Sequence, residues 1–303
     1  MSEEIELSTE STYDDWVNGI EDDAGFVYSK DGKRLLRCMN DGIGIKSYDI
    51  KDGTIVICNT VFHSFENLEK ITIPNSVVSI GGGAFYGCKS LQEIIIPDSV
   101  KTIGEAAFRD CENLEKVTIP NSVTSIEGWA FNNCKSLKRA TLPDSVISIG
   151  NECFAYCLSL QQINIPKSIT SIADGVFGSC ESLQQITIPD SIIEIGGEVF
   201  SDCKSLRHIT IPNSVTSIEK WAFLNCESLQ QIIIPDSVTF IGDMVFEGCS
   251  SLQQITITDS VNEFGEYVFR GCESLQKIII PEGSEVKFKE MLPEELWGKL
   301  CYA

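Results

Sequence analysis

Hydrophobic residues recur along this chain with a period of 23 residues. Residues 91–111, LQEIIIPDSVKTIGEAAFRDC, show the unit, which can be written L-x-x-I-x-I-P-x-S-V-x-x-I-G-x-x-A-F-x-x-C. A Phe holds the same place in ten successive units, from Phe62 to Phe269, and a Leu keeps step from Leu68 to Leu275. A fixed period of roughly 20 to 29 residues with spaced aliphatic side chains predicts a solenoid of stacked repeats.

The first part of each unit has the alternation of a short β-strand. In residues 91–96, Ile94 and Ile96 fall on one side and Glu93 and Ile95 on the other, and β-branched residues are frequent. Pro97 has no backbone N–H and therefore ends the hydrogen-bonded ladder. These positions predict a strand with one apolar face and one exposed face.

The second part of the unit predicts a further extended segment and a turn. Val100 and Ile103 fit the extended segment, whereas the spacing of Ala107, Phe108 and Cys111 is that of one inward-facing helical turn. A single 23-residue unit buries too few side chains to offset the loss of chain entropy. We therefore expect each repeat to fold only against its neighbours.

The N-terminal residues depart from the repeat. Residues 1–23 carry nine acidic residues and no Lys or Arg, which predicts an acidic mobile tail, with Trp16 and Val17 pinning its end to the fold. Residues 24–44 read as a β-hairpin with an Asp31-Gly32 turn, which would cap the first edge of the solenoid.

The repeats occupy residues 45–281, about ten units of which the first is degenerate. Residues 282–303 carry apolar side chains at mostly helical spacing and predict a C-terminal helical cap. The solenoid overrides the two-domain expectation from length, because a repeat array grows in one dimension.

Nine of the 13 cysteines form a column from Cys88 to Cys272, three residues after each repeat Phe. Phe65 takes this place in the first full unit, so the column favours apolar core with free thiols. Disulfides between repeats and metal ligation are the alternatives. Free thiols in this number point to a reducing, cytoplasmic location, and a secreted protein with its signal removed is the alternative.

The charge balance bears on the choice of partner. There are 44 acidic and 23 basic residues, and the net charge is −21. This field repels phosphate backbones and anionic lipid, so we expect neither nucleic acid nor a membrane as partner. No apolar run approaches the roughly 18 residues that a membrane span needs.

The repeat resembles the BspA-type leucine-rich repeat over residues 45–281, as found in proteins of anaerobic gut and oral bacteria. This resemblance implies a right-handed solenoid with a parallel sheet and a role in protein binding or adhesion, often at cell surfaces, with no catalytic residues. The expected fold is thus a mainly β leucine-rich-repeat solenoid with short helical turns, an N-terminal hairpin cap and a C-terminal helical cap.

Catalytic signals are poor. The chain has only two histidines, His63 and His208, and neither belongs to a recognisable catalytic or metal-binding motif. We therefore expect no enzymatic activity, no cofactor and no metal.

Two surfaces could contact a partner. The outward strand face is rich in Gln and Thr, which either stabilise the stacked strands or form a binding surface. The position two residues before the repeat Phe carries bulky side chains in consecutive units, which form either an interface or packing against the turns and the cap. The candidate partner-binding residues there are Trp221, Met244 and Tyr267, extended by Leu224 and Phe240, with Trp129 in the same column.

The resulting hypothesis is a non-enzymatic scaffold that binds another protein through an extended, preformed surface. The alternative is a secreted or cell-surface adhesion module that binds host or neighbouring-cell proteins. The sequence determines neither the identity of the partner nor the oligomeric state.

Overall fold

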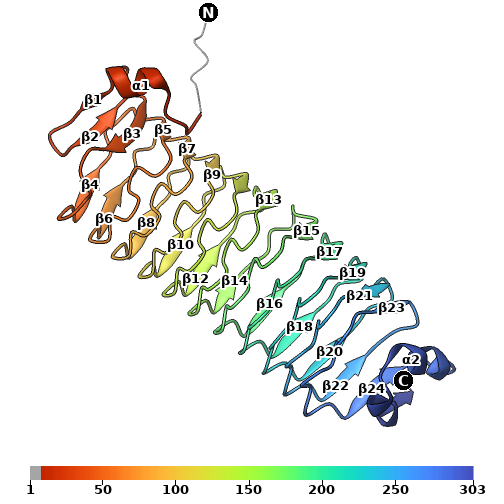
Figure 1. The fold of residues 1–303 in the computed structure, drawn as a ribbon. Helices are drawn as coiled ribbons and strands as arrows, with labels where there is room; N and C mark the ends of the chain where they lie inside the picture. Colours follow the sequence, from red (N-terminus) through yellow and green to blue (C-terminus); the bar gives the residue numbers. More distant parts are fainter. Residues whose placement is uncertain (1–7, 303) are drawn as a thin grey trace, which may run out of the picture. The chain divides into compact units, whose positions relative to one another are not determined.

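The repeats of this protein stack as a β-solenoid, seen in a computed structural model that describes residues 8–302 (Figure 1). The chain divides after Cys157 into two compact units, and each is built of 23-residue turns. Most turns contribute a longer strand to one parallel ladder and a shorter strand to another. The period in the sequence therefore becomes the step from one rung of a ladder to the next.

In the first unit both ladders are parallel and pair residues that lie 23 positions apart, as Val117 does with Ile94 and with Ala140. The longer strands are β4 (Ser47–Asp49), β6 (Lys70–Thr72), β8 (Glu93–Ile95), β10 (Lys116–Thr118) and β12 (Arg139–Thr141). The shorter strands are β5 (Val56–Ile57), β7 (Ser79–Ile80), β9 (Thr102–Ile103), β11 (Ser125–Ile126) and β13 (Ser148–Ile149).

The second unit repeats this arrangement. Its longer strands are β14 (Gln162–Ile163), β16 (Gln185–Thr187), β18 (His208–Thr210), β20 (Gln231–Ile233), β22 (Gln254–Thr256) and β24 (Lys277–Ile280). Its shorter strands are β15 (Ser171–Ile172), β17 (Glu194–Ile195), β19 (Ser217–Ile218), β21 (Phe240–Ile241) and β23 (Glu263–Phe264).

The predicted inward columns form the core of both units. Ile94 and Ile96 are buried and Ile95 is exposed, as the alternation predicts. The Phe rings stack on one another between adjacent repeats, with 5.2 Å between the centroids of Phe85 and Phe108 and an angle of 2° between their planes. Because each ring contacts the next repeat, neighbouring units stabilise one another.

The turn side of the repeat differs from the helical turn that spacing predicted. Its residues form consecutive β-turns: the Ala107 N–H donates to the Gly104 carbonyl (3.1 Å) and the Arg109 N–H to the Ala106 carbonyl (3.1 Å). The alternate N–H groups of Ala106 and Phe108 donate instead to the following repeat. In an α-helix, all of these N–H groups would donate hydrogen bonds within one repeat. In the turns, every second N–H group donates to the next repeat instead.

From residue 8 onward, the segment predicted as an acidic mobile tail over residues 1–23 contains regular secondary structure. It forms helix α1 (Tyr13–Asn18) and strand β1 (Ile20–Glu21). The remainder of that prediction, residues 1–7, lies outside the described residues. The prediction did not foresee that the buried Arg34 guanidinium, from a later part of the chain, pairs with the Asp15 carboxylate of this segment.

The hairpin predicted for residues 24–44 is present as the antiparallel strands β2 (Phe26–Tyr28) and β3 (Arg34–Cys38). Strand β3 pairs in parallel with β5, so the hairpin extends the ladder of shorter strands. Strand β1 pairs with β2 and ends that sheet. The hairpin therefore caps one of the two ladders of the first unit.

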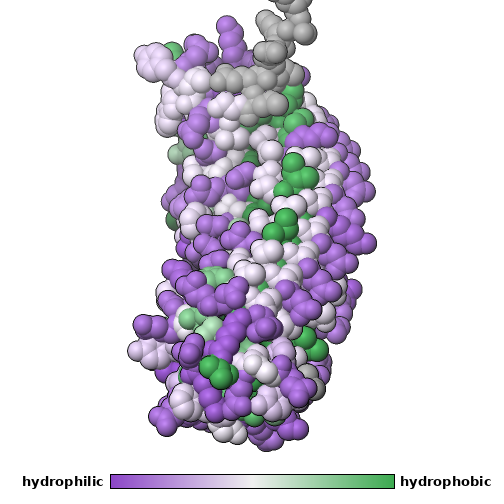
Figure 2. Space-filling view, turned by 90° about the vertical axis from the view of Figure 1, so that its right-hand side faces the viewer, coloured by the Kyte–Doolittle hydropathy of each residue, from purple (hydrophilic) through white to green (hydrophobic). Residues whose placement is uncertain are grey.

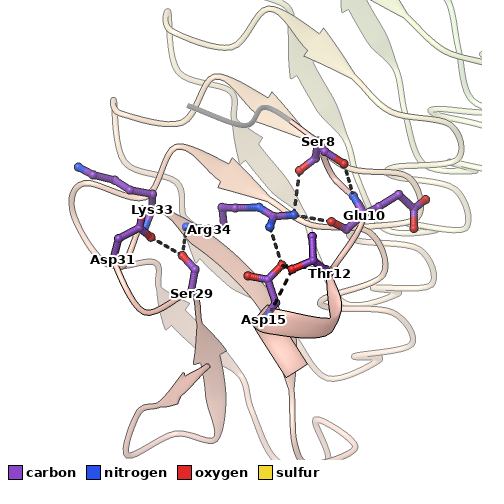
Figure 3. A network of polar contacts seen from close by, with 8 residues as sticks. All are labelled: Ser8, Glu10, Thr12, Asp15, Ser29, Asp31, Lys33 and Arg34. Atoms are coloured by element: carbon purple, nitrogen blue, oxygen red, sulfur yellow. Dashed lines mark hydrogen bonds and ion pairs between the residues drawn. The ribbon is translucent and has the colours of Figure 1, made fainter. Parts of the chain in front are cut away.

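A polar network around Arg34 holds the N-terminal segment on this hairpin (Figure 3). The buried Arg34 guanidinium forms an ion pair with the buried Asp15 carboxylate at 2.5 Å. It also donates to the carbonyl oxygens of Ser8 (3.0 Å) and Glu10. Asp15 accepts from the N–H of Thr12 in a capping box that begins α1. We call the Arg34–Asp15 pair the N-terminal latch.

The C-terminal cap predicted for residues 282–303 contains helix α2 (Glu285–Met291), the 3-10 helix η1 (Glu294–Lys299) and strand β25 (Leu300–Tyr302). Phe288 is fully buried. Its ring and that of Phe264 are arranged edge to face, with 6.4 Å between the ring centroids. Strand β25 pairs in parallel with β24, a final rung that the helical prediction did not include.

Candidate functional site

The column two residues before the repeat Phe has an unusual backbone conformation. All of its members lie in turns and have positive φ, between 52° and 64°. Glycine suits this left-handed conformation, and other residues cost roughly 1–2 kcal/mol there. The column comprises Thr60, Gly83, Ala106, Trp129 and Glu152 in the first unit, and Gly175, Glu198, Trp221, Met244 and Tyr267 in the second.

Three consecutive repeats of the second unit carry large side chains at this position. We name Trp221, Met244 and Tyr267 the turn stripe. The Trp221 indole N–H points at the Met244 sulfur (3.1 Å), a soft contact between adjacent repeats. Tyr267 is 53% exposed, whereas Trp221 and Met244 are half-buried. The stripe is therefore an ordered surface that remains accessible to solvent.

Cations lie over both aromatic rings of the turn stripe. The Lys220 ammonium lies 4.5 Å from the Trp221 ring centroid, and the Arg270 guanidinium lies 4.9 Å from that of Tyr267. Arg270 also donates to the Glu247 carboxylate through two nitrogens. These contacts restrict the rings, so a partner would meet side chains that are already positioned.

The other predicted site residues lie at three different places. Leu224 belongs to the same turns, since its N–H donates to the Trp221 carbonyl at 3.1 Å. Phe240 lies instead on strand β21, in register with Ser217 and Glu263, and so in a different column. Trp129 has the same left-handed conformation as Trp221 but belongs to the first unit.

The outward strand face remains the other candidate surface. Ile95 and Ile233 are exposed there, each in register with Thr side chains of a neighbouring strand. A shallow hollow beside Ile95 is also lined by Glu93 and Lys116. The lining of this hollow mixes charged and apolar side chains. Figure 2 shows one face of the molecule, largely hydrophilic with separate hydrophobic patches.

The cysteine column is core, as the sequence predicts. Eleven cysteines are buried, and Cys38 and Cys301 are half-buried. The buried thiols donate to the carbonyl of the Phe one repeat earlier, as Cys111 does to Phe85 and Cys226 to Phe200 (both 3.2 Å). Burial raises the pKa of Cys203 to about 12. A protonated thiol with a raised pKa is a poor nucleophile.

We expect a thiol reagent at neutral pH to modify about two cysteines of the native protein, Cys38 and Cys301, and all 13 in denaturant. Mass spectrometry of the labelled peptides would measure this. A Cys38→Ala, Cys301→Ala double variant serves as the control and should show almost no native labelling. Rapid native modification of the Cys column, or thiols missing after denaturation, would contradict the free-thiol core.

Neither histidine has a catalytic setting. His63 is exposed and stacks on Tyr86, with 4.8 Å between ring centroids, and its Nδ1 lies 3.1 Å from the Ser64 hydroxyl. His208 is exposed on β18. Among residues 8–302, no group of three or more His, Cys, Asp or Glu side chains is arranged to hold a metal ion. Within the same residues, the helices are too short or too polar to cross a membrane.

Trp16 and Val17 were expected to pin the N-terminal segment to the fold, but both are exposed and belong to an apolar cluster that the sequence reasoning missed. Tyr13, Trp16, Val17 and Ile20 all face solvent at the N-terminal end of the first unit. Two signals could have found them: the Thr12-to-Asp15 spacing of a capping box, and the apolar spacing of one helical face directly after it.

Comparison with known proteins agrees with this architecture. A family model described as "BspA type Leucine rich repeat region (6 copies)" matches residues 54–184 and 170–290. A leucine-rich repeat protein from Bacteroides ovatus is 31% identical in sequence, with a TM-score of 0.75 over 86% of this chain and 68% of that one. No curated protein matches the chain significantly.

Two further solved structures are similar. A Treponema pallidum leucine-rich repeat protein is 32% identical, with a TM-score of 0.51 over 59% of this chain and 84% of that one. A leucine-rich repeat protein from Eubacterium ventriosum is 23% identical, with a TM-score of 0.56 over 85% of this chain and 76% of that one, and shows the fold alone.

Proposed function

This chain belongs to the BspA-type leucine-rich repeat family, and on that premise we propose that it is a non-enzymatic scaffold whose turn stripe binds another protein. Trp221, Met244 and Tyr267 would form the centre of the contact, and Leu224 its margin. Repeat scaffolds present broad, rigid surfaces, and aromatic and Met side chains are enriched at protein interfaces.

The observation that carries the proposal is the run of large side chains on the left-handed backbone of the turn stripe. Gly83 and Gly175 occupy the same column without conformational cost. At Trp221 and Tyr267 the chain instead retains a large side chain in a conformation that costs roughly 1–2 kcal/mol. Tyr267 offsets little of this cost by burial, because half of it is exposed. The conformation recurs in every repeat, so the large side chains retained in it are what distinguish the turn stripe from the rest of the column.

The cysteine column supports a reducing, cytoplasmic location for this scaffold. Each buried thiol that donates to a Phe carbonyl must keep its proton, and oxidation would remove that donor from the core. A secreted or cell-surface adhesion module is the alternative proposal. The thiol count described above separates the two when it is made on protein isolated from its native cells, because disulfides in the column would favour the secreted module.

Glycine substitutions test the turn stripe. We expect the triple variant Trp221→Gly, Met244→Gly, Tyr267→Gly to fold, because glycine relaxes each left-handed position. Quantitative mass spectrometry of proteins captured from native-cell lysate would compare it with the unmodified protein. Loss of interface anchors typically costs 2 kcal/mol or more, so at least one captured protein should fall by about tenfold or more.

Glu198→Gly is the matched control, since Glu198 has the same conformation (φ 58°) in the same column but a charged side chain. Glu198→Gly should leave the set of captured proteins unchanged. Like the triple variant, it should gain stability, because glycine relaxes a left-handed position. If the triple variant captures the same proteins as the unmodified chain, the turn stripe is not the binding surface.

A further inference from the structure

Helix α1 has an inverted pattern of burial. Its only buried residue is the acidic Asp15, whereas its apolar residues face solvent. The exposed fractions are 85% for Tyr13, 61% for Trp16 and 61% for Val17, and Ile20, which begins β1, is 53% exposed. We name these four residues the N-terminal patch. A helix normally buries its apolar face against its own core, so this face is left for another surface.

The N-terminal patch is held rigidly although none of its apolar residues is buried. The latch from Arg34 to Asp15 fixes the helix, and a capping box fixes its first turn. Strand β1 continues from the helix and pairs with β2, Ile20 opposite Tyr28. A surface that is ordered before binding loses less entropy when a partner docks.

The charges around the N-terminal patch select the partner's chemistry. Asp14, Glu21 and Asp23 are exposed carboxylates on the same short segment. Beside the patch, the Arg37 guanidinium lies 4.1 Å from the centre of the Trp16 ring, which shows that this indole accepts a cation on its face. A second copy of this chain, with a net charge of −21, and anionic lipid would both be repelled.

We propose that the N-terminal patch docks a segment of a partner protein in which Arg or Lys side chains alternate with apolar ones. The apolar side chains would pack on Trp16, Val17 and Ile20, and the cations would pair with Asp14 and Glu21. This surface lies in the first unit, whereas the turn stripe lies in the second, so the proposal does not depend on the function assigned to the stripe.

The probe is a short amphipathic peptide of Arg and Leu, titrated by calorimetry against the full chain at physiological salt. We expect the affinity to fall at least about tenfold in a double variant, Trp16→Ser with Val17→Ser. We expect a similar fall in a triple variant, Asp14→Asn with Glu21→Gln and Asp23→Asn. Ile147→Ser is the matched control, because Ile147 is an equally exposed aliphatic residue outside the patch, and it should leave the affinity unchanged.

Control peptides separate this contact from general attraction to an acidic protein. A peptide with Ser in place of Leu should bind at least about tenfold more weakly, and one with Glu in place of Arg should not bind. The proposal is overturned if the Ser peptide binds equally well, or if Trp16→Ser, Val17→Ser has no effect. Patch-dependent binding to phosphatidylcholine vesicles, or a patch-dependent dimer in light scattering, would assign the surface to lipid or to a second copy and would likewise overturn it.

Discussion

Raising the pH above about 9 should unfold this protein over a narrow interval. Burial raises the pKa of ten buried thiols, to about 11 for Cys58 and about 12 for Cys88, and in the same direction for the other eight. Thiols exposed by unfolding titrate near their ordinary pKa of about 8.5 to 9. Circular dichroism during a pH titration would follow the transition.

The direction follows from which state holds more protons. Below the ordinary thiol pKa both states are protonated, and the buried thiols place no pH dependence on the free energy of unfolding. Above it the unfolded chain loses protons that the folded chain keeps, so stability falls until the pH reaches the folded pKa values. Each such thiol contributes about 1.4 kcal/mol per pH unit, or about 14 kcal/mol for ten. A typical stability of roughly 5–15 kcal/mol would therefore be lost within about one to two pH units.

The control removes thiols and measures the slope of unfolding free energy against pH. A Cys111→Ala, Cys134→Ala variant is less stable at neutral pH, because each change leaves a small cavity, yet above the ordinary thiol pKa its slope should be smaller by about 3 kcal/mol per pH unit. Thiolate absorbance that appears gradually in a still-folded protein would contradict the prediction, since it would mean that the column ionises in place.

Asp15→Ala should release the N-terminal segment from the hairpin. It leaves the buried Arg34 guanidinium without its carboxylate, and removal of one partner from a buried ion pair typically costs about 3–5 kcal/mol. Hydrogen exchange would measure the loss as faster exchange at the α1 and β1 amides, by about a hundredfold or more. The amides of the Phe column should keep their protection, because repeats are stabilised by their neighbours.

Two variants bracket the Asp15 result. Asp14→Ala removes the adjacent but exposed carboxylate, which only accepts from the Asn18 side chain, and it should change protection little. Asp15→Leu combined with Arg34→Met removes both charges and should recover much of the lost protection, because no buried charge remains. Equal effects of Asp15→Ala and Asp14→Ala would show that the latch does not hold the segment.

The repeat unit could be read from the sequence because its information is local and appears ten times. Ile94 and Ile96 alternate with exposed positions, and the Phe and Cys columns return at a fixed step. Where one repeat departs from the pattern, the neighbouring repeats still show it. The hairpin was equally readable, since its turn signal at Asp31-Gly32 lies between its two strands. The candidate column, too, was visible as a run of bulky residues.

Other features were decided by contacts between distant residues, which a one-dimensional pattern does not contain. Trp221 and Met244 have left-handed backbones in turns whose alternate N–H groups bond to the following repeat. Strand β25 forms because β24 offers it an open edge. Helix α1 turns its apolar side outward because Asp15 meets Arg34, 19 residues further along the chain. The sequence by itself determined the repeat and its core, and the tertiary structure decided which side chains are left to face a partner.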